Sequence, residues 1–215
     1  MKFKRNEIVS DLHEAAKSSK LGVCLLNKRA REIEVYNFDK VKNTFCKMFY
    51  DELKLRSFDA YYENVPQRDY LAIEFKNTSH FRLKELFSEL EEKAIDSHMI
   101  LLETFWKKKK LKQILENVRL LVVYNDSLNY GKGVKDICKG FNQVEPIQGD
   151  KKRNTKVPVM FENEEEFQQR KDVFCSKFEE EFYHKVEFVD KTQFEQDYIE
   201  AGYFKDMTEN EIVES

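Results

Sequence analysis

The sequence predicts an α/β fold in which a mixed central β-sheet is flanked by helices. Residues 118–124 form a largely apolar run, interrupted by Arg119, which is typical of a buried central strand. Residues 57–62 and 70–77 are two β-prone runs separated by the polar cluster at residues 64–68, and this arrangement favours an antiparallel pair of strands. Elsewhere, apolar residues recur every three or four positions, as they do on one face of a helix.

Before this strand pair, the same patterns predict four elements. Apolar residues at helical spacing predict a first helix over residues 6–18. Residues 21–26 and 32–36 are expected to form a hairpin across a basic turn, and a second helix is expected over residues 38–54.

After the strand pair, residues 77–79 offer an N-cap for a long helix. Its apolar stripe begins at Leu83 and can be followed to Leu115, although the polar residues 96–98 could divide it into two helices. The buried strand at residues 118–124 comes next. The elements expected beyond it are a long loop with a short helix at 129–158, a strand at 157–161, a helix at 163–184, a strand at 186–189 and a helix at 192–201.

The composition is that of a folded protein, and the length of 215 residues is that of a single domain. Aromatic residues make up 13% of the 215 residues, which argues against disorder although 36% are charged. The formal net charge of −3 excludes a uniformly basic nucleic-acid binder, so any contact with nucleic acid requires a local basic patch.

No apolar run approaches the roughly 20 residues that cross a bilayer, and no hydrophobic signal region follows the N-terminus, so we expect a cytoplasmic protein without a membrane partner. The four cysteines have no CxxC spacing, which fits neither a disulfide framework nor a zinc site.

The strongest functional signal is a pair of opposite charges within an apolar strand. Glu74 and Lys76 are two residues apart, so they point to the same face, where burial of charge must be offset by a partner or a metal. If the chain turns back at residues 64–68, Asp59 lies opposite Glu74, with Cβ atoms about 4.5–5.5 Å apart. Two carboxylates at that separation repel unless a cation lies between them. The pattern therefore predicts a divalent-metal site with a lysine beside it.

A structural ion pair would explain the same residues. An acid two positions before a lysine also occurs at Glu52, Glu91 and Asp150, as expected in so charged a chain. Those three acids lie in polar segments where both side chains can stay in water, whereas Glu74 lies in an apolar run. Both interpretations remain open at this point.

Together with the order of elements, these residues resemble the PD-(D/E)XK nuclease superfamily. The resemblance covers about residues 38–124 and rests on Asp59, Glu74 and Lys76. The length predicts a single α/β domain over residues 1–215. The resemblance implies a restriction-endonuclease-like core at about 38–124, which leaves a C-terminal α/β elaboration at about 125–205. Two features depart from the family pattern: Phe58 precedes Asp59 in place of proline, and a helix separates the early hairpin from the Asp59 strand.

The resemblance also implies an activity, that of a magnesium- or manganese-dependent endonuclease. Asp59, Glu74 and the backbone carbonyl of Phe75 would be the metal ligands. Lys76 would lie near the attacking water. The catalytic residues that the resemblance implies are therefore Asp59, Glu74 and Lys76.

Further residues are candidates for supporting roles. Asp69 is an alternative first acid, although it shares a strand with Glu74 and faces the other side. Asp51 or Glu52 could complete the metal shell. Two basic segments are candidates for contact with nucleic-acid phosphates: Lys107, Lys108, Lys109, Lys110, Lys112, Lys151, Lys152 and Arg153.

Three functions follow from these observations. The first is a nuclease that hydrolyses DNA or RNA in restriction, repair or anti-phage defence. The second is a non-catalytic module with a nuclease-like or other α/β fold, which binds a protein or a nucleic acid; a protein partner or a homodimer is compatible with either function. The third is an inhibitor that mimics nucleic acid through acidic residues 162–166 and 179–181, although a solvated helix face also explains those clusters.

Overall fold

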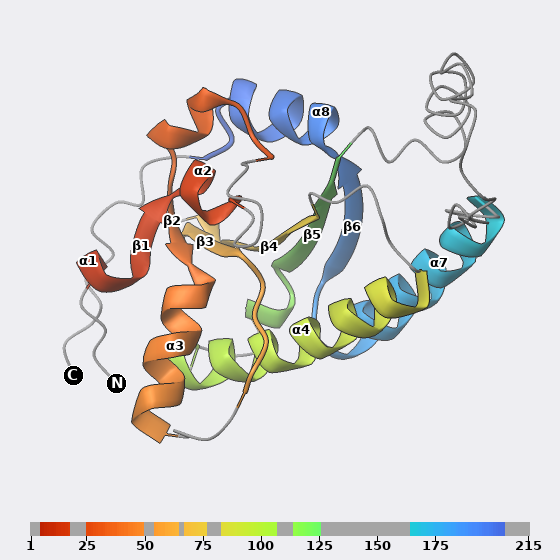
Figure 1. Ribbon diagram of the computed structural model, residues 1–215, viewed down its shortest axis with the longest axis horizontal. Coiled ribbons are helices and arrows are strands. Elements are labelled where there is room, and N and C mark those ends of the chain that lie inside the picture. Colours follow the sequence, from red (N-terminus) through yellow and green to blue (C-terminus); the bar gives the residue numbers. More distant parts are fainter. Residues whose placement is uncertain are drawn as a thin grey trace, which may run out of the picture.

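A six-stranded mixed sheet, with its strands side by side in chain order, forms the centre of the described part of the protein (Figure 1). The computed structural model describes residues 5–17, 25–49, 54–64, 67–76, 83–106, 114–125 and 164–204. The strands are β1 (Val9–Asp11), β2 (Glu34–Asn37), β3 (Ala60–Asn64), β4 (Asp69–Lys76), β5 (Val118–Tyr124) and β6 (Lys185–Asp190). Strands β1 to β4 are antiparallel, and β4, β5 and β6 are parallel. The predicted α/β class with a mixed sheet is confirmed.

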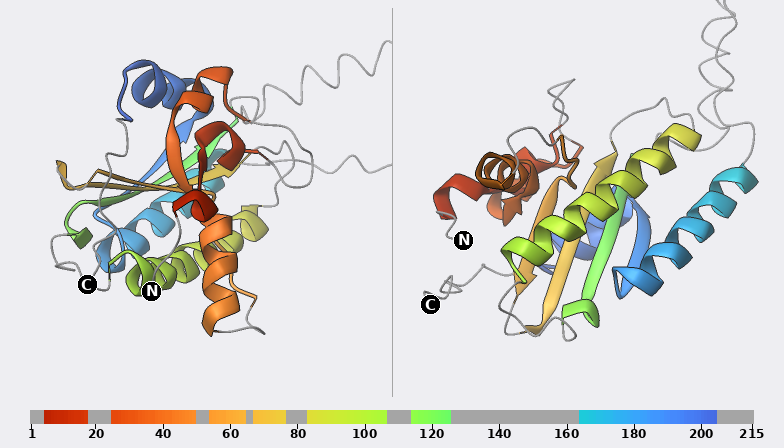
Figure 2. Two further views of the ribbon diagram at one scale, coloured as in Figure 1. Left: turned by 90° about the vertical axis from the view of Figure 1, so that its left-hand side faces the viewer. Right: turned by 90° about the horizontal axis from the view of Figure 1, so that it is seen from below.

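Helices cover both faces of this sheet (Figure 2). Helices α4 (Leu83–Thr104) and α7 (Glu164–Glu181) lie on one face, because each belongs to a connection between parallel neighbours, which must cross over the sheet. The other face carries α2 (Leu12–Ala15), the 3₁₀ helix η1 (Lys28–Glu32), α8 (Lys191–Phe194) and the π-helical segment η4 (Glu195–Glu200). Helix α1 (Arg5–Ile8) precedes β1, and α3 (Phe38–Phe49) joins β2 to the segment before β3.

Side chains of β4 point alternately into the two helical layers that cover the sheet. On one face, the Phe75 ring meets the Phe194 ring of α8 edge-on, with centroids 5.8 Å apart. On the other face, Phe87 of α4 contacts Phe174 of α7 at 6.0 Å. Since side chains alternate along a strand, Glu74 points to the layer that contains α4. The core beneath α4 is therefore where this buried charge must find its partners.

Among the N-terminal predictions, the helix at 38–54 corresponds to α3, but the first helix and the hairpin are wrong. In place of one helix at 6–18, the described residues form two short helices, α1 and α2, separated by β1, whose Val9 pairs with Tyr36 of β2. The Asp11 carboxylate accepts a hydrogen bond from Glu14 N at 2.7 Å, and this N-cap starts a new helix in place of a continuation of the first. The hairpin of residues 21–26 with 32–36 is also wrong, because β2 pairs with β1 and β3. Residues 21–24 lie outside the described residues.

The later elements agree more closely with the sequence. The predicted strands and helices at 57–62, 70–77, 118–124, 163–184 and 186–189 correspond to β3, β4, β5, α7 and β6. Helix α4 is not divided at residues 96–98, because Ser97 is buried and its hydroxyl accepts a hydrogen bond from Phe58 N at 2.9 Å. The final helix is divided into α8 and η4. The predicted loop at 129–158 and strand at 157–161 lie outside the described residues.

Candidate active site

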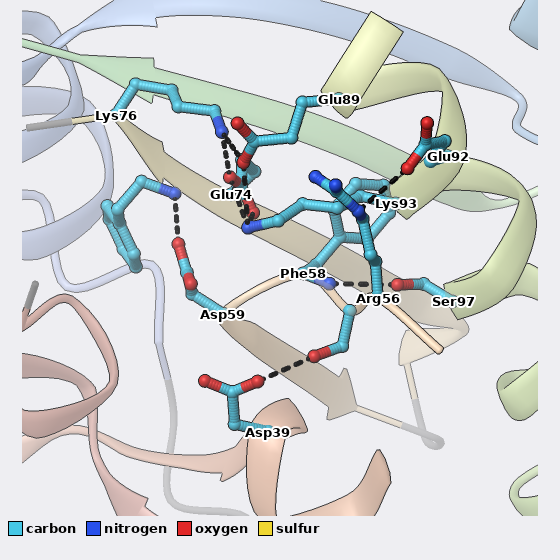
Figure 3. A network of polar contacts seen from close by, with 12 residues as sticks. Asp39, Arg56, Phe58, Asp59, Glu74, Lys76, Glu89, Glu92, Lys93 and Ser97 are labelled. Carbon is cyan, nitrogen blue, oxygen red and sulfur yellow. Dashed lines mark hydrogen bonds and ion pairs between the residues drawn. The ribbon is translucent and has the colours of Figure 1, made fainter. Parts of the chain in front are cut away.

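The register of β3 and β4 brings Asp59 beside Glu74. Ala60 pairs with Ile73, and the backbone N–H of Asp59 donates to Ile73 O at 3.0 Å, which continues the antiparallel ladder by one residue. The Asp59 carboxylate then accepts a hydrogen bond from Phe75 N through Oδ2 at 2.6 Å. The cross-strand placement expected for Asp59 and Glu74 is thus observed, and Figure 3 shows both at the same end of β4.

Glu74 is the centre of a network of charges between β4 and α4. Its side chain is fully buried, and its Oε1 lies 2.7 Å from Lys76 Nζ and 2.7 Å from Lys93 Nζ. Lys93 also reaches Glu74 Oε2 at 2.9 Å. Lys76 Nζ makes a second contact of 2.8 Å with Glu89 Oε1 (Figure 3). We call these four residues together with Asp59 the Glu74 cluster.

Neighbouring contacts fix the chain that leads into Asp59. Phe58 is tied to Ser97 of α4 by the hydrogen bond described above, and Ser57 Oγ donates to Asp39 Oδ1 of α3 at 2.8 Å. The carbonyl of Asp59 accepts from Phe38 N at 3.0 Å. These bonds hold the backbone of residues 57–59 between α3, α4 and β4, so the position of the Asp59 carboxylate is set by several elements.

The charges in the cluster act strongly on one another. Burial and the charge of Glu74 raise the pKa of Asp59 to about 8, although Lys93, Lys76 and the Phe75 hydrogen bond oppose this. Burial would lower the pKa of Lys93, but Glu74 and Asp59 outweigh it and hold that pKa above its ordinary value. The cluster contains three carboxylates and two ammonium groups. When all are ionised, one negative charge is left for a proton or an external cation to offset.

The donor atoms are compatible with magnesium or manganese. Among the described residues, no three His, Cys, Asp or Glu side chains are grouped so that they could hold a metal ion. Mg²⁺ needs fewer, because it is commonly bound by one or two carboxylates together with waters and substrate phosphates. Asp59 and Glu74 supply two carboxylates. The Phe75 carbonyl can supply a third oxygen, since the N–H and C=O of a strand residue face the same side and its N–H faces Asp59.

The remaining sequence candidates are elsewhere. Asp69 lies at the opposite end of β4, where its carboxylate is 3.3 Å from Arg119 Nη2 and is also bonded to Tyr203, so it does not join the Glu74 cluster. The following candidates lie outside the described residues: Asp51, Glu52, Lys107, Lys108, Lys109, Lys110, Lys112, Lys151, Lys152 and Arg153.

Sequence reasoning missed the contribution of α4. Glu89 and Lys93 are four residues apart, a spacing that usually marks an exposed helical ion pair. Here both lie on the face of α4 that carries the fully buried Leu90, and their closest ion-pair contacts are with Lys76 and Glu74 of β4. The available signal was the position of Lys93 next to the apolar stripe of the helix, which places a charge at the edge of the core.

Comparison with known protein families, with curated proteins and with solved structures finds no match for this chain. No helix in the described ranges is both long enough and apolar enough to cross a membrane. The class of the protein must therefore be inferred from its mixed α/β sheet and from the Glu74 cluster at the carboxyl end of β4.

Proposed function

We propose that the protein is a metal-dependent nuclease that hydrolyses phosphodiester bonds in DNA or RNA, with a restriction-endonuclease-like core at about residues 38–124. The observation that carries this proposal is the cross-strand pair of Asp59 and Glu74 with Lys76 beside it. A half-buried carboxyl whose pKa is raised to about 8 next to a second acid is an environment more typical of functional sites than of ordinary surfaces.

In this proposal Asp59, Glu74 and the Phe75 carbonyl hold one Mg²⁺ or Mn²⁺. When bound, such a metal lowers the pKa of a coordinated water and offsets negative charge on the reacting phosphate. Lys76 contributes a fixed positive charge at the same place, because its ammonium lies 2.7 Å from Glu74 Oε1. The hydrogen bond from Phe75 N orients the Asp59 carboxylate at the end of β4 that carries Glu74.

Nucleic acid is proposed as the substrate because the two basic segments, Lys107–Lys112 and Lys151–Arg153, offer cations for a phosphate backbone. Contacts of that kind depend on salt and carry no base sequence information. A role in restriction, repair or defence, within the cytoplasm, is part of the same proposal.

One observation favours a different function. Both oxygens of Glu74 are already in contact with lysine ammonium groups, as they would be in a structural ion-pair network. The second candidate is therefore a non-catalytic module with this α/β fold that binds protein or nucleic acid. The two candidates differ in whether Asp59 is needed for any chemistry.

The test compares wild-type protein with Asp59→Asn on plasmid DNA, single-stranded DNA and RNA, in the presence of Mg²⁺ or Mn²⁺. Asparagine retains an oxygen that can accept from Phe75 N but removes the negative charge. The matched control is Glu92→Gln, which neutralises an acid in the exposed ion pair with Arg56 at 2.7 Å. Cleavage by wild type and Glu92→Gln, with at least about a hundredfold loss in Asp59→Asn, supports the proposal. Equal products from wild type and Asp59→Asn, or no cleavage by wild type, would overturn it.

A further inference from the structure

The two lysines of the Glu74 cluster are held differently. Lys76 Nζ bridges two acids, with contacts of 2.7 Å to Glu74 and 2.8 Å to Glu89. Lys93 Nζ is 3.8 Å from Glu89, and its close contacts are the two oxygens of Glu74, at 2.7 and 2.9 Å. Lys93 therefore straddles one carboxylate, whereas Lys76 is fixed between two.

Lys93 is also the more accessible of the two. Its side chain is 17% exposed and that of Lys76 is 7% exposed. Lys93 extends from α4, on the far side of the cluster from the backbone of β4 (Figure 3). A lysine side chain has a flexible stem of four carbons, so its ammonium can move into water without a change in the helix. Lys76 would have to abandon two carboxylates to do the same.

The ammonium of Lys93 lies close to both acids that are proposed to bind the metal. Glu74 and Asp59 both act electrostatically on its ammonium, and Lys93 acts more strongly on Asp59 than Lys76 does, although Lys76 also contacts Glu74. A divalent cation between those acids would carry twice the charge into the same place, and an ammonium left beside it would be repelled. The two cations therefore compete.

We propose that Lys93 is the exchangeable counter-ion of the site: it neutralises Glu74 when no metal is bound, and a divalent cation displaces it. The inference rests on the proposed metal-dependent function. It assigns Lys93 a role in setting how much metal the protein needs, which is distinct from the role proposed for Lys76. It also explains how a fully buried Glu74 is tolerated in the metal-free protein.

The experiment measures Mn²⁺ binding by calorimetry, without nucleic acid, for wild type, Lys93→Met and Lys42→Met. Lys42 is the matched control, because its side chain is 19% exposed and its ammonium lies 2.6 Å from Asp39, outside the Glu74 cluster. Lys93→Met is expected to lower the apparent Kd for Mn²⁺ by at least about tenfold, and Lys42→Met to change it less than about threefold. Mn²⁺ should also raise the Tm of Lys93→Met more than it raises that of wild type.

A second measurement uses wild-type protein, so it does not depend on the folding of Lys93→Met. The ¹⁵N signal of the Lys93 ammonium, assigned with Lys93→Arg, should lose its protection from solvent exchange when Mg²⁺ is added. Metal binding with no change in this signal, or equal affinity in wild type and Lys93→Met, would overturn the inference and leave the proposed function in place. If neither protein binds Mn²⁺, the proposed metal site itself is wrong.

Discussion

Neutralisation of Glu74 should destabilise the fold far more than neutralisation of an exposed acid with the same ion-pair distance. Glu74→Gln keeps the shape of the side chain but leaves Lys76 and Lys93 without their shared carboxylate. The comparison is Glu92→Gln, because the Arg56–Glu92 contact is 2.7 Å long, as is that of Lys93 with Glu74. The two pairs differ in burial: Arg56 and Glu92 are 49% and 55% exposed, and Glu74 is 1% exposed.

The expected magnitudes follow from this difference in burial. Removal of one partner from a buried ion pair typically costs about 3–5 kcal/mol, and Lys76 keeps Glu89 as a partner, so we expect about 3 kcal/mol for Glu74→Gln. An exposed pair contributes at most about 1 kcal/mol, and we expect about 0.5 kcal/mol or less for Glu92→Gln. Distance alone would predict equal effects.

Urea unfolding at neutral pH in EDTA measures both variants, with equal m-values as the check that only stability has changed. Double-mutant cycles then isolate each pair, with Lys93→Met combined with Glu74→Gln and Arg56→Met combined with Glu92→Gln. The coupling energy of the buried pair should reach about 2 kcal/mol and persist in about 1 M NaCl, where the exposed pair should lose its coupling. Equal coupling energies in the two cycles, or loss of both in salt, would refute the reasoning.

Three further predictions concern single side chains. Asp59→Asn removes a carboxyl whose folded pKa lies above its unfolded value, so the stability of the wild type should fall as the pH rises from about 4 to 8. Because Asp59 is only half-buried, the free energy of unfolding of the variant, measured in EDTA, should gain about 1–2 kcal/mol relative to the wild type over this range. A difference between the two proteins that does not depend on pH would contradict this prediction. His98 is buried among the rings between α4 and α7, and burial lowers its pKa to about 4, so wild type should lose stability as the pH falls from about 6.5 to 4. His98→Leu should abolish about 2 kcal/mol of that loss in urea unfolding, and an unchanged acid slope would show that another group is responsible. Leu90→Ala should cost about 3 kcal/mol because Leu90 is fully buried, whereas Ile95→Ala, at a position 47% exposed on the same helix, should cost less than about 1 kcal/mol; similar values would argue against this orientation of α4.

The sequence was most informative where structure depends on local patterns. The apolar run at residues 118–124 coincides with β5, since helices cover both faces of the sheet and a strand buried on both faces shows little polar alternation. The antiparallel pairing of Asp59 beside Glu74 followed from a polar turn and the two-residue period of a strand. Both inferences used contacts between residues close along the chain.

The sequence was least informative where partners are distant. Val9 pairs with Tyr36, which is far along the chain, and no local pattern distinguishes that short strand from a continued helix. Lys93 likewise has the spacing of an ordinary surface charge, and its contact with Glu74 depends on how α4 crosses the sheet. Which side chains neutralise Glu74 is a property of tertiary packing, so it could not be predicted from the strand that contains it.

The sheet also bears on how the protein is made, because its strands are arranged in the same order as they leave the ribosome. Each newly synthesised strand finds its neighbour already present, and none must insert between two that have paired. All five charged side chains of the Glu74 cluster belong to the portion translated before β6. The buried charges can therefore meet early in synthesis, before α7 arrives to cover Phe87 of α4.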